Sequence, residues 1–556
     1  MRLKNLELQG YKTFAGKAEF VFPTGITAIV GPNGSGKCVS GDTLITLADG
    51  RDVPIRELVE AALSGSQSVE TLDDGMLTHE NPQGIQILSL NPTTLHLEHH
   101  PVASFIKRQA PFSLLRIRTR AGREVTATPY HPLFTLENGH LRALDAQELK
   151  LGKRIALPRR LPVSGDQVDL PPFEVLQQFV HDDEIYVPNS ESLKEWANTA
   201  RTKFGTFVEW AHVADVPFTQ FKGMLDKQAV NTSVLVRLAH AAELTPPLDG
   251  RLKSHGPTQF LLPSTFTPDL ARFLGLLVAE GRNTDANQVW FVNSDPAVND
   301  EFERLAQTLF GVQVERKHYK PNAEDSPIYS RTLGMVLERL FNFPVASSSA
   351  EKQVPPQVFE ADEKVQWAFL SGLFEGAAYI CVRPKAEGKR ATAYIEYATA
   401  SPLLAQQVVA LLLRLGVFAV LRPKQKYASN TIEKRHRTYY SVLLYGTEQL
   451  RYVAQHLEFV GEKHTALQAL RQSPSANNPN LDVIPGVTPL VKEAARMAGA
   501  KLKPNRKNHP KLMAYADNRC EASRNGLIQV VGQITQLGTT PEAAREYLDR
   551  LSALAT

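Results

Sequence analysis

A glycine-rich loop near the N-terminus constrains this chain most, because the sequence after it does not continue as the loop requires. Apolar and β-branched residues predict a strand over 25–30 that runs into Gly31-Pro32-Asn33-Gly34-Ser35-Gly36-Lys37. Such a Walker A loop binds phosphate through its backbone N–H groups and its lysine, and it continues with Ser or Thr at the start of a helix. Here Cys38 follows, a soft ligand that suits Mg²⁺ poorly. Residues 39–50 predict a strand and a tight turn instead of a helix.

The first 37 residues resemble the N-terminal segment of SMC chromosome-segregation ATPases, with Gly10-Tyr11-Lys12-Thr13-Phe14 before the loop. The resemblance implies that the host protein binds ATP through a set of loop residues. These are Gly31, Asn33, Gly34, Gly36 and Lys37. No signature motif, second nucleotide motif or long heptad coiled coil follows in the sequence. An ATP-binding head fragment is one interpretation of the chain, and an element inserted after Lys37 is the other.

Two segments beyond the loop resemble sequence blocks of inteins. Cys38-Val39-Ser40-Gly41-Asp42-Thr43 resembles their first block, and residues 125–133 resemble their Thr-x-x-His block with Thr128 and His131. The resemblance implies that the Cys38 thiol attacks the Lys37 carbonyl to form a thioester, that His131 protonates the departing nitrogen, and that Thr128 orients the scissile peptide. A hedgehog-type autoprocessing domain shares the same fold and first step, and the P-loop flank favours the intein.

Residues 38–160 read as β-rich, which suits the all-β Hint fold of inteins. Alternating segments at 113–119 and 123–128 are joined by a turn at Ala121-Gly122, and residues 151–158 are expected to form an exit strand. Inteins finish with a second His block and a His-Asn pair, and the sequence does not end in this way. We therefore expect an incomplete splicing domain whose partner is a missing C-terminal intein and extein portion.

A repeated pattern in the centre of the chain indicates a pseudo-symmetric domain. Glycine-bearing apolar helices are expected over 273–281 and 370–378, each followed by alternating strand residues and then by a helix that begins with proline, at Pro296 and Pro402. This order resembles the α+β fold of LAGLIDADG homing endonucleases. The resemblance implies that the strands bind double-stranded DNA and that acids at the helix ends hold Mg²⁺.

The two helix ends differ in their acids. Glu280 occupies the first position and is expected to be both a catalytic residue and a metal ligand, whereas the second position is Ala377. A different register would use Glu375, at the expense of the match at Gly372. We therefore expect a degenerate endonuclease that nicks or only binds DNA, and a DNA-binding module without catalysis is the alternative.

Basic residues on the predicted strands and loops of the second repeat are candidate phosphate contacts. They are Arg383, Lys385, Lys389, Arg390, Lys424, Lys426, Lys434, Arg435 and Arg437. The net charge of +4 is too small to indicate a nucleic-acid partner for the chain as a whole.

Helical accessory regions are expected on either side of the repeat. Within residues 161–262, a short helix framed by 210–217 and 234–239 has the spacing of a helix-turn-helix, although the glycine of its turn is absent. Residues from 480 onward, with a basic run between Lys501 and Lys511, resemble the extra DNA-binding region of some endonuclease-bearing inteins.

The sequence thus predicts a multidomain protein. The expected boundaries are 1–37 for the ATPase segment, 38–160 for the Hint part, 161–262 for the helical insertion, 263–475 for the endonuclease-like domain and 476–556 for the accessory region. The three cysteines form no disulfide framework, and Cys381 and Cys520 are expected to be packing residues. With no signal peptide and no membrane-spanning segment expected, we place the protein in the cytoplasm.

Overall fold

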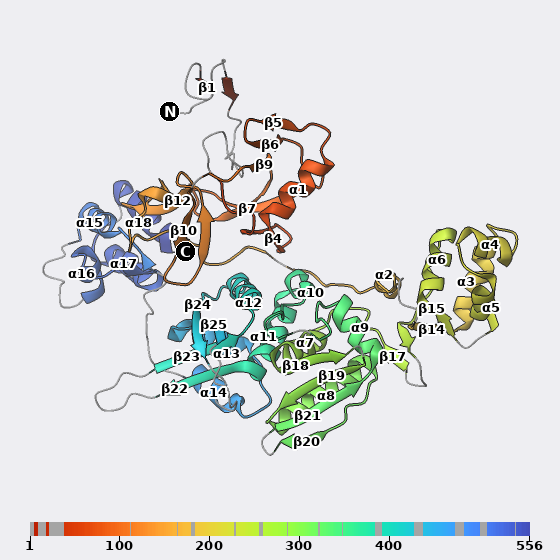
Figure 1. The fold of residues 1–556 in the computed structure, drawn as a ribbon. Coiled ribbons are helices and arrows are strands. Elements are labelled where there is room, and N and C mark those ends of the chain that lie inside the picture. The colour runs from red at the N-terminus through yellow and green to blue at the C-terminus, as the bar shows by residue number, and fades with distance from the viewer. Residues whose placement is uncertain are drawn as a thin grey trace. The chain divides into compact units, whose positions relative to one another are not determined.

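A computed structural model gives the structure of the protein. It describes residues 5–8, 18–21, 38–111, 113–163, 165–179, 184–226, 229–254, 259–285, 287–320, 323–346, 348–383, 392–426, 437–472, 483–500, 509–539 and 541–555. The chain forms two compact units, Met1–Val163 with Asn477–Thr556, and Ser164–Ala476 (Figure 1). The Walker A residues Gly31 to Lys37 and the strand expected before them lie outside the described residues.

The first unit is built largely from antiparallel strand pairs. The strands are β1 (Asn5–Leu8), β2 (Ala18–Val21), β3 (Leu44–Thr46), β4 (Asp52–Pro54), β5 (Glu70–Leu72), β6 (Gly75–Thr78), β7 (Gln86–Leu90), β8 (Leu97–Pro101), β9 (Phe105–Arg108), β10 (Leu115–Arg118), β11 (Glu124–Ala127), β12 (Pro132–Glu137) and β13 (His140–Asp145). The hairpin β10–β11 confirms the turn predicted at Ala121-Gly122, and β12–β13 forms a second hairpin. Gly122 and Gly139 in these two turns adopt φ values of 81° and 76°. Glycine reaches this left-handed region without steric cost.

Two expectations for residues 38–160 were wrong. The segment is not all-β, because the helix α1 (Ile55–Gly65) and the short 3₁₀ helix η1 (Ala146–Glu148) lie within it. Helix α1 buries Ala62 in a small core with Leu47 and Phe105. Residues 151–158 form no strand. They run beside β12 through a single backbone bond, from the Ala156 N–H to the Phe134 carbonyl at 2.7 Å.

Helices complete the first unit, as expected for the C-terminal region. They are α15 (Thr488–Met497), α16 (Pro510–Ala516), α17 (Arg524–Leu537) and α18 (Glu542–Ala555), with a short pair β26 (Val483–Ile484) and β27 (Ala522–Ser523). Their core includes Val491, Leu512 and Leu551, and Leu136 of β12 packs against it. The accessory region therefore packs with the expected splicing part of the chain.

The second unit contains the predicted repeat. Its first half consists of α7 (Pro268–Glu280), β18 (Gly281–Asp285), β19 (Gln288–Asn293), α8 (Pro296–Phe310), β20 (Lys317–Lys320), β21 (Ala323–Tyr329) and α9 (Arg331–Arg339). The second half consists of α10 (Pro356–Glu360), α11 (Glu363–Ala377), β22 (Ala378–Arg383), β23 (Thr392–Thr399), α12 (Pro402–Arg414), β24 (Val420–Lys426), β25 (Arg437–Leu444), α13 (Thr447–His456) and α14 (Lys463–Arg471). The sheet orders β18-β19-β21-β20 and β22-β23-β25-β24 are the same, which confirms the duplication.

The two long helices α7 and α11 pack closely between the two sheets (Figure 1). Glycine makes this approach possible. A Cβ on Gly275 would lie 2.3 Å from the Phe369 carbonyl oxygen, and a Cβ on Gly372 would lie 2.3 Å from the Arg272 carbonyl oxygen. The reciprocal distances show that the two glycines lie on a local pseudo-twofold axis.

The insertion before this repeat is helical, as expected, and also contains a four-stranded sheet. Its elements are α2 (Pro172–Gln177), β14 (Tyr186–Pro188), α3 (Glu191–Arg201), α4 (Phe207–Val213), α5 (Phe218–Asp226), β15 (Ala229–Asn231), α6 (Thr232–Ala242), β16 (Arg251–Lys253) and β17 (Gln259–Leu261). Trp210 is fully buried among Trp196, Phe204 and Phe221. The insertion therefore has a dense aromatic core.

Two further observations concern the rest of the chain. Within the residues that the structure describes, no helix is long and apolar enough to cross a membrane. Cys381 is buried, as expected, whereas Cys520 is exposed, so the prediction that Cys520 is a packing residue was wrong. It sits in a turn after α16, where few neighbours cover it.

Candidate functional site

Cys38 and Thr128 are held together by reciprocal hydrogen bonds. The Cys38 N–H donates to Thr128 Oγ1 at 2.9 Å, and the Thr128 N–H donates to the Cys38 carbonyl oxygen at 2.9 Å. The Ser40 N–H donates to the Thr126 carbonyl at 2.8 Å, which extends the pairing along the end of β11. The Cys38 nitrogen that donates to the Thr128 hydroxyl oxygen is the nitrogen of the Lys37–Cys38 peptide bond.

His131 follows Thr128 in a tight turn. Its N–H donates to the Thr128 carbonyl at 3.0 Å, and Pro129 occupies the position that proline favours in such a turn. The Ala146 N–H in turn donates to the His131 carbonyl at 2.9 Å. Thr128 is buried and His131 is half-buried, and this turn fixes His131 three residues after the threonine that contacts Cys38.

The Cys38 thiol lies in a partly buried environment. Burial raises the pKa of the Cys38 thiol above its ordinary value, and the Arg108 guanidinium opposes this rise. Arg108 is itself paired with Asp74, whose carboxylate raises the pKa of the thiol further. The thiol is therefore protonated at neutral pH and carries the proton that its reaction must move.

Glu280 ends α7 in the second unit. The helix begins at the Thr267 N-cap, whose side chain accepts from the Leu270 N–H, and it stops where Gly281 turns into β18. Desolvation raises the pKa of the Glu280 carboxyl, and Lys352 and Lys463 oppose this rise. The equivalent end of α11 carries Ala377, as the sequence predicted, so the pair of helix ends presents a single carboxylate.

Two lysines that the sequence did not single out lie at these helix ends. Lys352 Nζ donates to the carbonyls of Val278 and Ala279 at 2.9 and 3.4 Å, and Lys463 Nζ donates to those of Glu375 and Gly376 at 2.5 and 3.2 Å. Burial lowers the pKa of Lys352 to about 8, with Glu280 opposing, and burial also lowers the pKa of Lys463. No sequence motif surrounds both lysines, so only the structure could identify them.

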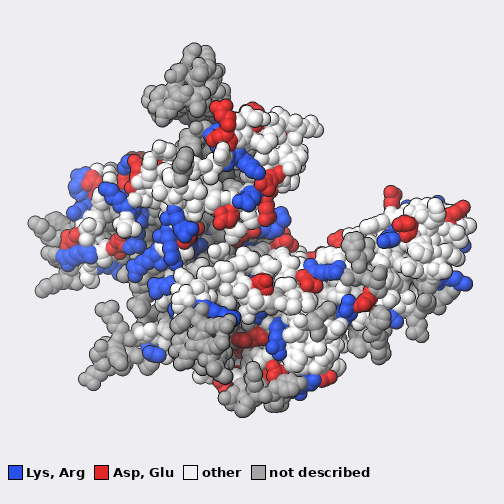
Figure 2. All heavy atoms as spheres, viewed as in Figure 1, with Lys and Arg blue, Asp and Glu red and all other residues white. Residues whose placement is uncertain are grey.

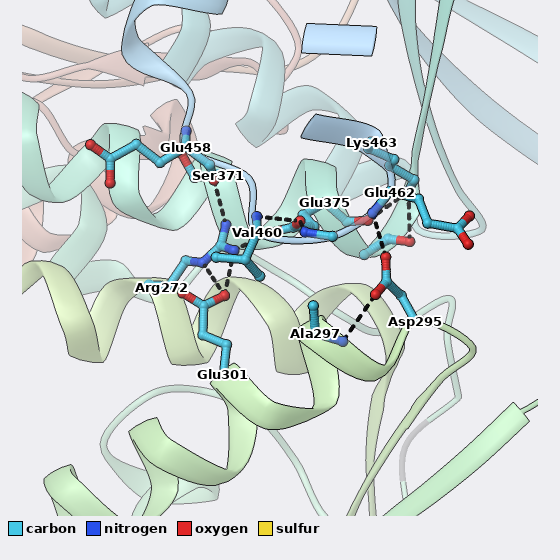
Figure 3. A network of polar contacts seen from close by, with 12 residues as sticks. Arg272, Asp295, Ala297, Glu301, Ser371, Glu375, Glu458, Val460, Glu462 and Lys463 are labelled. Atoms are coloured by element: carbon cyan, nitrogen blue, oxygen red, sulfur yellow. Dashed lines mark hydrogen bonds and ion pairs between the residues drawn. The ribbon is translucent and has the colours of Figure 1, made fainter. Parts of the chain in front are cut away.

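Glu375 has a structural role in a buried polar network (Figure 3). Its carboxylate pairs with Arg272, which also donates to Glu301 at 2.5 Å. The other Glu375 oxygen accepts from the N–H groups of Val460 and Gly461 at 2.8 and 2.7 Å. Figure 3 shows Glu375 directed toward these partners. The alternative in which Glu375 replaces the missing acid is therefore wrong.

The residues at the helix ends do not form a metal site by themselves. Among the described residues, no group of three or more His, Cys, Asp or Glu side chains gathers in a way that could hold a metal ion. Two ammonium groups, Lys352 and Lys463, act on the lone Glu280 carboxylate. This donor set does not fit the expected Mg²⁺.

Three of the nine predicted DNA contacts have described side chains. Arg383 and Arg437 are exposed on β22 and β25, whereas Lys424 pairs with Glu396, whose carboxylate also accepts from the Ser441 hydroxyl at 2.7 Å. The side chain of Lys426 is not described. The other five, Lys385, Lys389, Arg390, Lys434 and Arg435, lie outside the described residues. In the first half, the sequence prediction missed Arg282, which is exposed on β18 and stacks over Trp290 at 5.0 Å.

Comparisons with known proteins concern both units. The family model of the intein splicing domain matches residues 45–538. The replication factor C small subunit of Pyrococcus horikoshii is 34% identical over 134 residues, which are 24% of this chain and 14% of that protein. The crystal structure of the PabCDC21-1 intein is 30% identical, covering 23% of this chain and 76% of that one, with a TM-score of 0.21.

A structure of mesophilic variants of the homing endonuclease I-DmoI is 16% identical, covering 36% of this chain and 97% of that one, with a TM-score of 0.23. The chain spans between 14% and 42% of the length of three curated relatives that it matches.

Proposed function

Because this chain belongs to the intein family, whose splicing-domain model matches most of its length, we propose that it performs the first step of protein splicing at the Lys37–Cys38 bond. In this step the Cys38 sulfur bonds to the Lys37 carbonyl carbon, the carbon–nitrogen bond breaks, and the nitrogen becomes the free amine of Cys38. The product is a thioester that joins residues 1–37 to the Cys38 side chain. The observation that carries the proposal is the 2.9 Å hydrogen bond from the Cys38 N–H to Thr128 Oγ1.

The residues around the bond have distinct proposed roles. Thr128 fixes the orientation of the scissile peptide through its hydroxyl and backbone bonds to Cys38. His131, in the same turn, supplies a proton to the departing nitrogen. The thiol of Cys38 loses a proton in the same step, so the net change is a proton moved from sulfur to nitrogen. The raised pKa of the thiol is compatible with this transfer, because no free thiolate has to accumulate.

The host protein is proposed to be an SMC-type ATPase interrupted within its phosphate-binding loop. The support is the sequence of residues 1–37 alone, with Gly31, Asn33, Gly34, Gly36 and Lys37 as the ATP-binding residues of the host. Cys38 cannot supply the hydroxyl that such a loop uses for Mg²⁺. ATP binding therefore belongs to the host after the inserted element is removed.

The second unit is proposed to bind double-stranded DNA. The support is the duplicated helix-and-sheet architecture, with exposed Arg383 and Arg437 on one sheet and exposed Arg282 on the other. Phosphate contacts from such residues give affinity without sequence information. Since the helix ends present one carboxylate, binding rather than efficient cleavage is the proposed activity.

The splicing proposal is tested with hydroxylamine, which cleaves thioesters much faster than amides. We expect the purified chain to release residues 1–37 as a hydroxamate that mass spectrometry identifies, and Cys38→Ala to release none. Equal release from both chains, or release from neither, would contradict the acyl shift at Cys38.

The DNA proposal is tested with a labelled duplex of random sequence, by fluorescence anisotropy at several salt concentrations. We expect Arg383→Ala and Arg437→Ala each to weaken binding and to reduce the salt dependence by roughly one counterion. The matched control is Lys364→Ala, because Lys364 is an exposed cation at the beginning of α11, at the opposite end of the helix from Ala377. No measurable binding by the unaltered chain would refute the DNA proposal and leave the splicing proposal intact.

A further inference from the structure

The same small module occurs twice in this chain, once in each unit. In residues 184–253 the order is β14, α3, α4, α5, β15 and α6, and in residues 483–537 it is β26, α15, α16, β27 and α17, with residues 501–508 outside the described part. In both copies the first short strand pairs antiparallel with the second. Three helices separate the paired strands in the first segment and two described helices separate them in the second, so the shared feature is the strand pair with the helix that follows it.

The strand pairs match residue by residue. A proline lies at the end of each first strand. Pro188 is the last residue of β14, and Pro485 directly follows β26. In each segment, the residue two positions before the proline pairs with the N-cap residue of the helix that follows the second strand. Tyr186 pairs with Asn231, the N-cap of α6, and Val483 pairs with Ser523, the N-cap of α17. Both caps bind the first turn of their helix, since Asn231 accepts from the Ser233 N–H and Ser523 from the Gly526 N–H. The two segments therefore share the register of this strand pair and the capped helix that follows it.

The first copy has the internal geometry of a helix-turn-helix. Helix α4 ends at Val213, and Asp215 adopts a φ of 53°, the left-handed conformation that glycine usually supplies in this turn. Asp is one of the few other residues that tolerate this conformation. The Asp215 carbonyl accepts from Arg237 at 3.0 Å, which ties the turn to α6. The absence of a glycine in the sequence therefore does not exclude this motif.

The pattern of burial around the turn separates a packed face from an open face. Trp210, Ala211, Ala214, Val216 and Phe221 are all buried in the module's core. The residues at the beginning of α5 point outward instead. They are Pro217, Phe218, Thr219, Gln220 and Lys222, all of which are exposed. Exposure of the N-terminal residues of the second helix is what reading a major groove requires.

The two copies differ in charge. Residues 483–537 contain nine Lys and Arg against three Asp and Glu, whereas residues 184–253 contain eight of each. In Figure 2, Lys and Arg gather over α15–α17, while the face of the α3–α6 region is mostly uncharged. A neutral module gains little from phosphate attraction, so its contribution to binding would come from contacts with bases.

We propose that α5 is a recognition helix that enters the major groove of double-stranded DNA and reads bases through Gln220, Thr219 and Phe218. The amide of Gln220 can make a bidentate contact with adenine, and the Phe218 ring can contact a thymine methyl group. This inference rests on the proposed DNA binding by the second unit and adds sequence selectivity to it.

The test uses the full chain and a library of duplexes with a randomised segment. Bound duplexes are selected and sequenced for the unaltered chain, for Gln220→Ala, and for Asn198→Ala, the matched control with an exposed amide on α3. We expect the unaltered chain and Asn198→Ala to select a sequence with several blocks of preferred bases. Gln220→Ala should lose the preference at one position by roughly 5- to 150-fold, while its affinity for unselected DNA stays unchanged.

The other outcomes are distinguishable. If the unaltered chain binds duplexes but selects no sequence, or if Gln220→Ala, Thr219→Ala and Phe218→Ala all keep its preference, the recognition role of α5 is refuted and DNA binding by the sheets stands. If the unaltered chain binds no duplex, the proposed DNA function fails, and this inference fails with it.

Discussion

Lys352 and Lys463 cap equivalent carbonyl groups at the ends of α7 and α11. Lys352 binds the carbonyls of Val278 and Ala279, and Lys463 binds those of Glu375 and Gly376. The two helices repeat in sequence, but the lysines come from unlike segments, a loop before α10 and the first position of α14. A positive charge at a helix C-terminus is favourable, so in both halves a lysine ammonium group stabilises the end of the long helix.

The lowered pKa of Lys352 predicts an unusual reactivity. Burial lowers the pKa of the Lys352 amine to about 8 in the folded protein, whereas the pKa of a lysine in an unfolded chain is about 10.4. Acetylation by a trace of acetic anhydride requires the neutral amine, so we expect the modification of Lys352 to rise with a midpoint near pH 8. Peptide mass spectrometry measures this, with the urea-unfolded chain as reference, and equal midpoints in both states would contradict the burial of this amine.

The buried network predicts that Glu375 stabilises the fold. In Glu375→Ala, Arg272 keeps Glu301 and the Glu458 carbonyl as partners but loses its ion pair with Glu375. The N–H groups of Val460 and Gly461 lose their acceptor, and we expect a total cost of about 3–5 kcal/mol. Faster hydrogen exchange in the segment 458–463 would report this loss. Glu280→Ala is the control, because burial already disfavours the charged form of that carboxyl. Similar exchange in both variants would refute the structural role of Glu375.

The single carboxylate at the helix ends predicts a gain of function. Ala377→Glu places a second carboxylate opposite Glu280 at the end of α11, as a metal-dependent phosphodiester cleavage needs. We expect Mg²⁺-dependent cleavage of the selected duplex to appear in this variant and to vanish when Glu280→Gln is added. If Ala377→Glu binds the duplex and cuts it no faster than the unaltered chain, the missing acid is not what limits cleavage.

The close contact of α7 and α11 predicts a large effect from one methyl group. In Gly372→Ala the new Cβ would meet the Arg272 carbonyl at 2.3 Å, so the helices must separate, at a cost of about 1–3 kcal/mol. Gly532→Ala in α17 is the matched control, because nothing lies within 4 Å of its Cβ position. Alanine there should stabilise the helix by about 0.5–1 kcal/mol. Hydrogen exchange of α7 and α11 should become faster in Gly372→Ala and stay unchanged in Gly532→Ala. Unchanged exchange in Gly372→Ala would count against the close packing of α7 and α11.

Much of the second unit could be predicted from the sequence. The paired glycines, the strand alternation after each helix and the prolines at Pro296 and Pro402 are all local signals, and each corresponds to an observed element. These local signals sufficed because neighbouring residues alone determine turns, caps and amphipathic faces. Thr128, by contrast, was singled out by the resemblance of residues 125–133 to an intein block, and its turn was not predicted.

The remaining features depend on contacts between distant residues. Lys352 and Lys463 become neighbours of Glu280 only after folding. The polar partners of Glu375, which are Arg272 and the N–H groups of Val460 and Gly461, likewise come from two distant segments. Helix α1 was missed within a segment read as all-β, where turn and strand signals surround it. Asp215 was not predicted as the turn residue, because glycine is the residue that usually adopts its left-handed conformation.

The rate of thiol-induced release of residues 1–37 tests the central claim, that the Thr128 hydroxyl orients the Lys37–Cys38 bond for attack by the Cys38 thiol. Release by dithiothreitol is compared for the unaltered chain, Thr128→Ser and Thr128→Val, which has a similar shape and fits the same buried space. We predict that Thr128→Ser, which keeps the hydroxyl at the Cys38 N–H, reacts at nearly the original rate, and that Thr128→Val is roughly tenfold slower. A Thr128→Val chain that releases the peptide as fast as the unaltered one would contradict the account.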